Sequence, residues 1–357
     1  MSEKTYSVVL LPGDGIGPDV TEQAVRVLEG VAQAGGFAFD FSTEVAGGAA
    51  IDQDQNPMPD RVIEQCLAAD AVILGAVGGP KWDHFTGNMR PESGLLKIRK
   101  ELGVFANLRP VSVPPSLAES SPLRTDAVSG TNFLVVRELI SGIYFGQPRG
   151  NDGTEAFNTM RYHRSEIERV ARVAFEWARK RDNRLCSVDK HNVLEVSQLW
   201  RTVVTELHQA EFADVELSHM YVDNAAMQLV LNPRQFDVIV TGNIFGDILS
   251  DAGATLPGSL GLLPSASLGG QTGLFEPVHG SAPDIAGKGI ANPIACIACA
   301  AMLLDDLGET AAAAAIHAGI EAALNTGART ADLTRDNPVS TEAMGSLILE
   351  HALAAMG

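Results

Sequence analysis

Short apolar runs alternate with longer amphipathic segments near the start of the chain. This pattern predicts strands at 6–11, 37–43 and 71–75, with helices at 18–33 and 60–69 between them. Two strands joined by a helix pair in parallel, because the helical crossover returns the chain to the same end of the sheet. We therefore expect an α/β fold whose sheet contains parallel pairs.

The sequence changes character between 107 and 131, where Pro, Ser and other polar residues accumulate. Apolar patterns resume beyond this stretch. They predict strands at 132–136, 143–145, 185–188 and 215–222, and helices at 164–180 and 194–207. The polar stretch is therefore interpreted as a crossing into a second domain.

The Gly- and Pro-rich stretch 253–273 is interpreted as the return crossing. Ala-rich helices at 293–324 are then expected to pack back on the first sheet. This organisation predicts a discontinuous domain of residues 1–104 and 258–357, and a second domain of residues 105–257.

A glycine-rich turn, Pro12 to Gly17, follows the first predicted strand. Its glycines fall as G-x-G-x-G, whereas the dinucleotide fingerprint is G-x-G-x-x-G. Asp14 within the turn would also face a pyrophosphate with like charge. A tight strand-to-helix turn, with Pro18 at the helix start, explains the pattern better than a Rossmann dinucleotide-binding fold.

The charge of the chain narrows the class of partner. Lys and Arg number 26 and Asp and Glu 44, which gives a net charge of −18. Such a field repels nucleic acid and anionic membranes, and no basic tract relieves it. The longest apolar run, 293–304, is shorter than the roughly 20 residues that span a bilayer. We expect a small substrate, with no nucleic acid and no membrane as partner.

The four cysteines, Cys66, Cys186, Cys296 and Cys299, are scattered through apolar surroundings. This suits reduced thiols in a cytoplasmic protein. Cys296 and Cys299 form a C-x-x-C, but no second Cys or His pair accompanies them, so a buried helix is favoured over a redox or zinc site.

Two aspartates four residues apart, Asp247 and Asp251, follow the apolar run 236–241 and Gly242. Side chains at i and i+4 share one helix face, so both carboxylates point the same way. Hard carboxylate oxygens suit Mg²⁺ or Mn²⁺. Taken alone, the pair fits a solvated helix face at least as well as a metal site.

Arginines stand out in so acidic a chain where they lie in apolar or Gly/Pro contexts, as Arg99, Arg109 and Arg137 do. Guanidinium groups bind carboxylates in a bidentate manner, so three together would hold a dicarboxylate. The alternative is three independent surface arginines. Glu92, Leu95, Leu96 and Arg99 would share one helical face able to contact a charged group and an alkyl branch.

Tyr144 and Lys190 each come at the end of a strand-like run, where catalytic residues gather in α/β folds. A lysine can act as a base and a tyrosine as a proton donor, although residues at such positions are more often structural than catalytic. The loop 279–292 is rich in small residues and polar groups. Its Asp284 could accept hydrogen bonds from ribose hydroxyls and would oppose a 2′-phosphate, which favours NAD over NADP.

Five motifs in order resemble the β-decarboxylating 2-hydroxyacid dehydrogenases, the isocitrate/isopropylmalate family. They are PESGLLKIRK at 91–100, RELISGIYFG at 137–146, DKHNVL at 189–194, GNIFGDILSD at 242–251 and EPVHGSAPDIAGK at 276–288. The resemblance spans essentially the whole chain. It implies a two-domain α/β fold with a mixed sheet that is not a Rossmann fold.

The resemblance also implies roles for individual residues. Arg99, Arg109 and Arg137 would bind the substrate carboxylates. Asp247 and Asp251 would hold Mg²⁺ or Mn²⁺ together with Asp223 of the partner subunit. Lys190 would also cross the interface of a homodimer and face Tyr144, as the second catalytic residue. NAD would lie against Gly78, Gly79, Pro91, Glu276, His279, Gly280, Ser281, Ala282, Asp284 and Asn292.

The implied reaction is the oxidation and decarboxylation of 3-isopropylmalate with NAD to 4-methyl-2-oxopentanoate and CO₂, in leucine biosynthesis. Isocitrate-specific relatives need a polar contact, often serine, where Glu92 stands. Glu92 would repel a third carboxylate, while Leu95, Leu96 and Val193 of the partner subunit offer an apolar pocket. A methylene or two discriminates by only about 1–3 kcal/mol, so side activity on malate or tartrate is compatible with this site.

Overall fold

The computed structural model describes residues 4–357. These form two compact units, one of 4–104 with Ser259–Gly357 and one of Phe105–Gly258. We predict that the first unit binds the cofactor, and that the second unit binds substrate and metal and forms the dimer.

The sheet of the first unit has the strand order β2–β1–β3–β12–β11. The strands are β1 (Lys4–Gly13), β2 (Phe37–Thr43), β3 (Ala71–Ala76), β11 (Pro264–Leu268) and β12 (Gly273–Pro277). All neighbours pair in parallel except β11 and β12, which are antiparallel. Every residue of β3 is buried, which explains its continuous apolar sequence. The expectation of an α/β fold with a mixed sheet is confirmed.

The stretch 253–273, interpreted as the return crossing, also contains the strand β11, which was not predicted. The sequence of β11, PSASL, lacks the bulky residues that signal a strand. Its small side chains are nevertheless buried, and the Ser265 hydroxyl donates to the carbonyl of Glu276 at 2.9 Å. Pairing with β12 therefore decides the structure of this segment.

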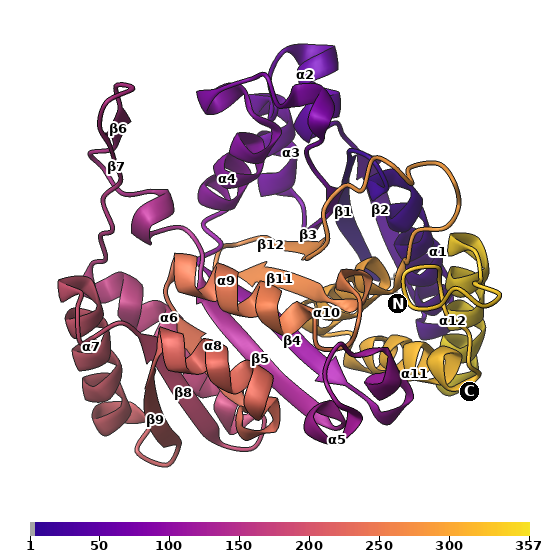
Figure 1. Ribbon diagram of the computed structural model, residues 1–357. Coiled ribbons are helices and arrows are strands. Elements are labelled where there is room, and N and C mark those ends of the chain that lie inside the picture. Colours follow the sequence, from indigo (N-terminus) through magenta and orange to yellow (C-terminus); the bar gives the residue numbers. More distant parts are fainter. Residues whose placement is uncertain (1–3) are drawn as a thin grey trace. The chain divides into compact units, whose positions relative to one another are not determined.

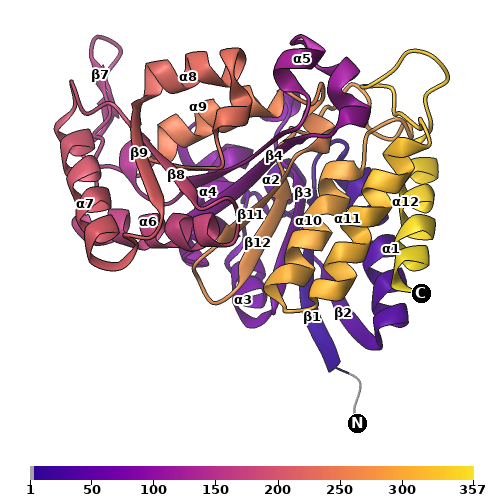
Figure 2. The same cartoon turned by 90° about the horizontal axis from the view of Figure 1, so that it is seen from below.

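Four helices of the first unit pack against one another (Figure 2). They are α1 (Gly17–Gly35), α10 (Ile294–Asp306), α11 (Thr310–Asn325) and α12 (Thr341–Met356). Nearly all of α10 is buried, including Cys296 and Cys299, so its C-x-x-C belongs to the core. Shorter helical elements complete the unit: α2 (Gly47–Asp54), α3 (Asp60–Ala68), α4 (Pro91–Glu101), and the 3-10 turns Pro80–Trp82, Gly87–Met89 and Leu260–Leu262.

The sheet of the second unit has the order β4–β5–β10–β8–β9. The strands are β4 (Ala106–Val113), β5 (Thr131–Glu138), β8 (Arg184–Asp189), β9 (Glu216–Tyr221) and β10 (Val238–Thr241). Only the β4–β5 pair is antiparallel among these neighbours. The stretch 107–131 is thus not wholly a crossing, since it contains most of β4. The sequence does not predict β4 as a strand, because it contains Pro110 and polar side chains that turn out to be buried.

The strand expected at 143–145 was also wrong. Gly142–Tyr144 is a 3-10 turn, in which the backbone N–H of Phe145 approaches the carbonyl of Gly142 at 3.4 Å. Gly142, which directly precedes the predicted strand, has a φ of 73°, a left-handed conformation that turns the chain before 143–145. The apolar run therefore reflects packing of a turn and not an extended segment.

The helices of the second unit include α8 (Val222–Leu231) and α9 (Asn243–Ala254), which lie side by side (Figure 1). The others are α5 (Thr125–Val128), α6 (Arg164–Arg179), α7 (Glu195–Glu211), and the 3-10 turns Pro115–Ser120 and Pro233–Gln235. A small hairpin of β6 (Gly150–Asn151) and β7 (Ala156–Phe157) projects from this unit.

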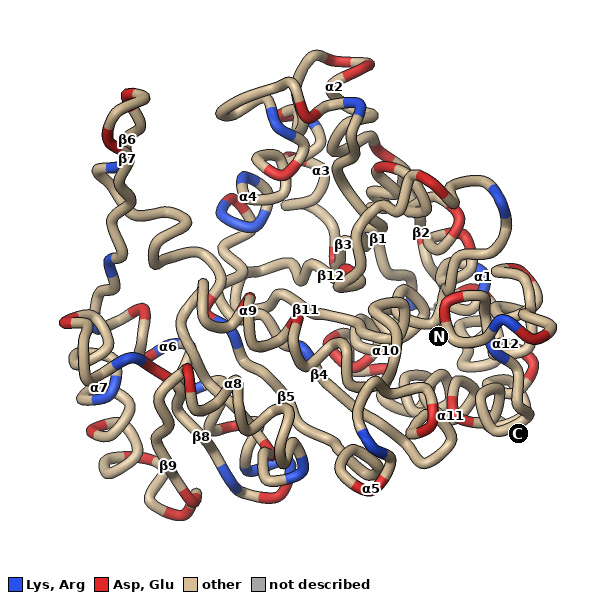
Figure 3. Tube along the Cα trace, in the orientation of Figure 1, with Lys and Arg blue, Asp and Glu red and all other residues tan. Residues whose placement is uncertain are grey.

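Charged residues of both signs are interspersed along the trace of each unit (Figure 3). Among the residues described, no helix combines the length and the apolar character needed to cross a membrane.

Candidate active site

Asp247 and Asp251 project from successive turns of α9 in the second unit. The buried strand β10 ends at Thr241, Gly242 precedes the helix, and α9 begins at Asn243. The strand-to-helix transition predicted from the sequence is confirmed. The side chains of Asp247 and Asp251 are 32% and 60% exposed, and each accepts hydrogen bonds from a buried arginine. They are therefore more than a solvated helix face.

The two arginines come from the antiparallel pair β4 and β5. Arg109 Nη1 donates to an oxygen of Asp251 at 2.8 Å, and Arg137 Nη1 donates to Asp247 at 2.5 Å. Their side chains are only 8% and 3% exposed. The alternative of independent surface arginines is thus excluded for Arg109 and Arg137.

Neutral side chains orient these guanidinium groups. Asn107 accepts from Arg109 Nε at 2.7 Å, and the Ser250 hydroxyl accepts from its Nη1 at 2.8 Å. The fully buried Asn243 accepts from Nε and Nη2 of Arg137 at 3.2 and 2.8 Å. None of these three residues was predicted from the sequence. The only signal for Asn243 and Ser250 was their place inside the motif that contains the aspartates.

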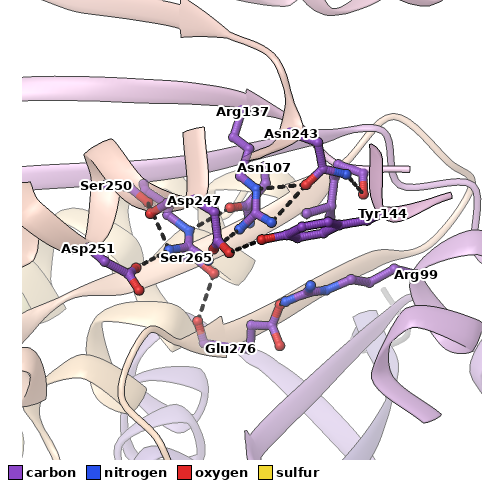
Figure 4. Close-up of polar contacts among 12 residues, drawn as sticks. Arg99, Asn107, Arg137, Tyr144, Asn243, Asp247, Ser250, Asp251, Ser265 and Glu276 are labelled. Atoms are coloured by element: carbon purple, nitrogen blue, oxygen red, sulfur yellow. Dashed lines mark hydrogen bonds and ion pairs between the residues drawn. The ribbon is translucent and has the colours of Figure 1, made fainter. Parts of the chain in front are cut away.

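Tyr144 completes this cluster. Its hydroxyl donates to Asp247 Oδ2 at 2.7 Å, so Asp247 lies between the phenol and the Arg137 guanidinium (Figure 4). Burial, assisted by the hydrogen bond to Asp247, raises the pKa of Tyr144 to about 12. The phenol therefore keeps its proton at neutral pH and is available as a proton donor.

Lys190 and Asp223 form a separate pair in the same unit. Lys190 directly follows β8, and Asp223 lies in the first turn of α8. The Lys190 ammonium donates to Asp223 Oδ1 at 2.6 Å, and this contact lowers the pKa of Asp223. Val193, predicted to line a partner's pocket, is 63% exposed.

A divalent cation fits the chemistry of the α9 carboxylates. Burial raises the pKa of Asp251, and the neighbouring Asp247 adds to this effect against the opposing influence of Arg109. The charge of Asp247 disfavours ionisation of Asp251, and a bound cation would relieve this repulsion. Within residues 4–357 of one chain, however, no three His, Cys, Asp or Glu side chains come together to hold a metal.

In the first unit, Arg99 of α4 is paired with Glu276 of β12. Arg99 Nε donates to Glu276 Oε1 at 3.1 Å, and Nη2 contacts the same oxygen. Both side chains are buried, with 9% and 6% exposed. Two residues predicted for different roles, substrate and cofactor binding, thus share one buried ion pair.

The remaining predicted substrate residues lie on α4, a helix expected from its pattern. Glu92 is exposed, and Leu95 and Leu96 are partly exposed. The carboxylate of Glu92 comes so close to Gly78 that a Cβ on this glycine would lie 2.7 Å from Glu92 Oε1. The helix therefore brings Glu92 next to the predicted cofactor segment that begins at Gly78.

The loop 279–292 packs on the start of α1. The backbone N–H of Ile16 donates to the Ser281 carbonyl at 2.8 Å, and that of Gly287 donates to Asp19 at 3.0 Å. His279 Nδ1 lies 2.9 Å from the Gly280 carbonyl, while its buried Nε2 has no partner within the described part of the protein. An orphaned ring nitrogen in a loop with an exposed Asp284 fits contact with a polar ligand such as a dinucleotide.

The other predicted cofactor residues differ in accessibility. Ser281 and Asn292 are buried, and Asn292 Nδ2 donates to Asp332 at 3.0 Å. Ala282 has a φ of 37°, and Gly280 is exposed. The buried Pro91 starts α4, whereas Gly78 and Gly79 have φ values of 97° and 152°. These glycines leave the backbone of their segment uncovered by a Cβ.

Known proteins resemble the chain over almost its whole length. A family model described as isocitrate/isopropylmalate dehydrogenase matches residues 7–348. A 3-isopropylmalate dehydrogenase from Salinibacter ruber is 60% identical over 98% of this chain and 96% of its own length. One from Wolinella succinogenes is 55% identical over 98% of each chain.

Solved structures agree with this assignment. A crystal structure of isocitrate dehydrogenase from Methylococcus capsulatus has a TM-score of 0.85 and 35% identity, covering 97% of this chain and 99% of that one. A β-decarboxylating dehydrogenase from Thermococcus kodakarensis, in its apo form, has a TM-score of 0.80 and 36% identity, with coverage of 97% and 96%. The chain belongs to the isocitrate/isopropylmalate dehydrogenase family.

Proposed function

We propose that this protein is a 3-isopropylmalate dehydrogenase. It oxidises and decarboxylates (2R,3S)-3-isopropylmalate with NAD to 4-methyl-2-oxopentanoate and CO₂, a step of leucine biosynthesis. The observation that carries the proposal is the α9 carboxylate pair held against two buried arginines and a tyrosine. Relatives with this name, 60% and 55% identical, support the choice of substrate.

Substrate binding is assigned to the arginines. Arg109 and Arg137 present planar guanidinium groups that match carboxylates in shape and charge. Their orienting partners, Asn107 and Asn243, lock both groups before any substrate arrives, which reduces the entropy lost on binding. Arg99 is proposed as the third carboxylate ligand.

Asp247 and Asp251, joined by Asp223 of the partner subunit, would hold Mg²⁺ or Mn²⁺. When bound there, the ion would acidify the C2 hydroxyl and stabilise the charge that develops on loss of CO₂. Arg137 and Arg109 remain beside these carboxylates and limit their repulsion. The arginines thus offset the negative charge of two acidic side chains on successive turns of α9.

Proton movements are assigned to Lys190 and Tyr144. Lys190, after losing its own proton, accepts the proton of the C2 hydroxyl directly or through water. Tyr144 then donates a proton to C3 after decarboxylation, since its phenol is protonated at neutral pH. NAD, when bound along 78–91 and 276–292, supplies the acceptor for the hydride of C2. Asp284 favours NAD over NADP through its charge.

The preference for 3-isopropylmalate is assigned to α4. The exposed Glu92 would repel the third carboxylate of isocitrate, and Leu95 and Leu96 would contact the isopropyl group. Val193 of the partner subunit would complete the apolar pocket.

A homodimer is proposed from the surface of the second unit. Met227, Val230 and Leu231 of α8 and Ile248 of α9 are 57%, 55%, 65% and 58% exposed. Positions 227, 230 and 231 share one helix face, so they form an apolar stripe that a second copy would cover. Pairing through α8 would also carry Lys190 and Asp223 toward the partner.

The four buried free cysteines suit the reducing cytoplasm, which is the proposed location.

The test is a steady-state comparison of 3-isopropylmalate, isocitrate and tartrate with NAD⁺ and NADP⁺ in the presence of Mg²⁺. We expect the highest kcat/KM for 3-isopropylmalate with NAD⁺, and preference for isocitrate would contradict the assignment.

Lys190→Met should lower kcat by at least about 100-fold. The matched control is Lys180→Met, which removes an exposed lysine at the end of α6. Full turnover by Lys190→Met would refute the proposed base.

A further inference from the structure

Asp14 is a buried carboxylate that the proposed mechanism does not use. It lies in the turn between β1 and α1 and is 4% exposed. Its Oδ2 accepts the backbone N–H groups of Gly48 at 2.8 Å and Gly78 at 2.7 Å, and its Oδ1 accepts that of Ala49 at 2.8 Å. The side chain therefore points into protein backbone and would not face a ligand phosphate.

Two of these donors belong to the first turn of α2. This helix follows Ala46, whose side chain cannot accept a hydrogen bond, so its first N–H groups need another partner. Asp14 supplies that partner from a distant part of the chain, and the positive end of the helix favours its negative charge. The first turn of α2 is thereby tied to the β1–α1 turn.

The third donor, Gly78, begins the predicted cofactor segment after β3. The backbone N–H of Asp14 itself donates to the carbonyl of Ala76, the last residue of β3, at 2.8 Å, so hydrogen bonds attach the turn both to the end of β3 and to the segment that follows it. On the other side, a Cβ at Gly15 would lie only 1.9 Å from the carbonyl oxygen of Ser281. The β1–α1 turn thus contacts both segments along which NAD is proposed to bind.

These contacts explain why the turn contains glycines. Gly13 and Gly15 have φ values of 71° and 59°, and a Cβ at Gly13 would lie 1.9 Å from the Ala76 carbonyl oxygen. The turn needs glycine because other backbone approaches it closely, which is a different use from admitting a pyrophosphate.

We propose that Asp14 is a positioning residue for the cofactor, which sets the segment at Gly78–Gly79 relative to the loop at Ser281. The inference rests on the proposed use of NAD. Asp14 contacts neither the cofactor nor the substrate and acts through the backbone that it holds.

Asp14→Asn tests this role with a nearly isosteric change. An asparagine has one acceptor oxygen, so its NH₂ group would face at least one of the three N–H donors. Losing one buried hydrogen bond to a charged acceptor corresponds to about a tenfold change in an equilibrium. We expect the KM for NAD⁺ and the Kd for NADH, measured by calorimetry, to rise at least about tenfold. The KM for 3-isopropylmalate and kcat at saturating NAD⁺ should change less than about twofold.

Asp40→Asn is the matched control, because it makes the same change at an exposed position of β2. It should leave all these constants unchanged. Unaltered NADH affinity in Asp14→Asn would overturn the proposal. Equal losses in NADH affinity, substrate KM, kcat and thermal stability would also overturn it, since they would indicate a general structural role.

A measurement on the wild-type protein covers the case in which Asp14→Asn does not fold. Hydrogen exchange should slow on NADH addition in peptides that contain 46–50, 77–80 and 279–284. Unchanged exchange in the first two would contradict the inference.

Wild-type turnover separates the proposed role of Asp14 from the proposed function. If wild-type protein binds NADH but does not oxidise 3-isopropylmalate, the proposed function fails while the role of Asp14 can still be judged from NADH affinity.

Discussion

At the scale of single residues, paired charges govern the cluster formed by Arg109, Arg137, Tyr144, Asp247 and Asp251. Asp247 accepts hydrogen bonds from Arg137 and Tyr144 at once. Arg137 is in turn oriented by Asn243, whose amide donates to the carbonyls of Leu139 and Ser141 at 2.9 and 3.0 Å. Each polar group is therefore held by a neutral or oppositely charged partner, as buried polar groups must be.

Tyr144→Phe is expected to impair the proton transfer and leave substrate binding nearly intact. The variant keeps the ring beside Arg137 and removes only the hydroxyl. The kcat for 3-isopropylmalate should fall about 100-fold or more, with KM changed by less than about threefold. Steady-state kinetics measure both constants. Tyr6→Phe removes a phenol in the other unit and serves as the control. A Tyr144→Phe enzyme with wild-type kcat would exclude the phenol as proton donor.

Asn243→Ala is expected to release the Arg137 guanidinium. Both hydrogen bonds to the Asn243 oxygen are lost, and the arginine gains rotamers that do not match a carboxylate. The KM for 3-isopropylmalate should rise at least about tenfold, and the free energy of unfolding should fall by about 1–3 kcal/mol. Asn325→Ala, at an exposed position of α11, is the control. An unchanged KM would show that Asn243 has no part in orienting Arg137.

At the scale of elements, the end of one strand can place charged side chains in different environments. β5 ends in Arg137 and Glu138, and the two side chains have different surroundings. Glu138 is fully buried, accepts from the backbone N–H groups of Ile140 and Ser141 at 3.2 and 3.0 Å, and lies 3.5 Å from Arg169 of α6. Burial outweighs these contacts and raises the pKa of Glu138 to about 7.

This raised pKa predicts a pH dependence of stability. Between about pH 4.5 and 7 the folded protein keeps the Glu138 proton, whereas the unfolded chain has released it. The contribution of Glu138 to the free energy of unfolding is therefore fully present below the unfolded pKa and is lost as the pH rises toward 7. The loss amounts to at most about 3 kcal/mol.

Glu138→Gln should remove this titration. Urea unfolding at pH 5 and pH 7.5 would show a smaller change in the free energy of unfolding than in the wild-type protein. Glu216→Gln, at an exposed end of β9, should retain the wild-type change. A wild-type pH dependence in Glu138→Gln would mean that Glu138 is ionised throughout this range.

At the scale of the whole molecule, the proposed metal site would need a ligand from a second chain. In one chain Asp223 is paired with Lys190, and no third acidic ligand joins Asp247 and Asp251 among residues 4–357. The exposed apolar stripe on α8 and α9 offers a surface for a second copy. A homodimer would then assemble each site from two chains.

Mixed dimers test whether the sites are shared. Lys190→Met and Asp251→Asn should each be inactive alone. If each site takes Asp251 from one chain and Lys190 from its partner, a heterodimer of the two variants contains one intact site. Random reassortment of equal amounts should restore about a quarter of wild-type activity, since half of the dimers are mixed and each has one good site. No recovery in confirmed heterodimers would place both residues in sites built from a single chain.

Leu231→Glu should weaken the homodimer itself. The charge would lie within the apolar stripe of α8, where burial without a partner is costly. Light scattering after size-exclusion chromatography should show monomer, accompanied by loss of turnover. Leu67→Glu makes the same change on α3, where Leu67 is 41% exposed, and should leave the oligomeric state unchanged. A Leu231→Glu variant that stays dimeric would move the interface elsewhere.

The amino-acid sequence by itself determined the α/β class, most helices, the strand before α9 and the resemblance that named the family. These signals are local, since hydrophobic periodicity and short motifs depend on neighbouring residues. Tertiary structure alone decided that β4 and β11 are strands, that 142–144 is a turn, and that Asn107, Asn243 and Ser250 orient the arginines. Those features depend on partners far along the chain, such as Asp14 with Gly78. A buried polar side chain looks like a surface residue in the sequence until its distant hydrogen-bond partner is known.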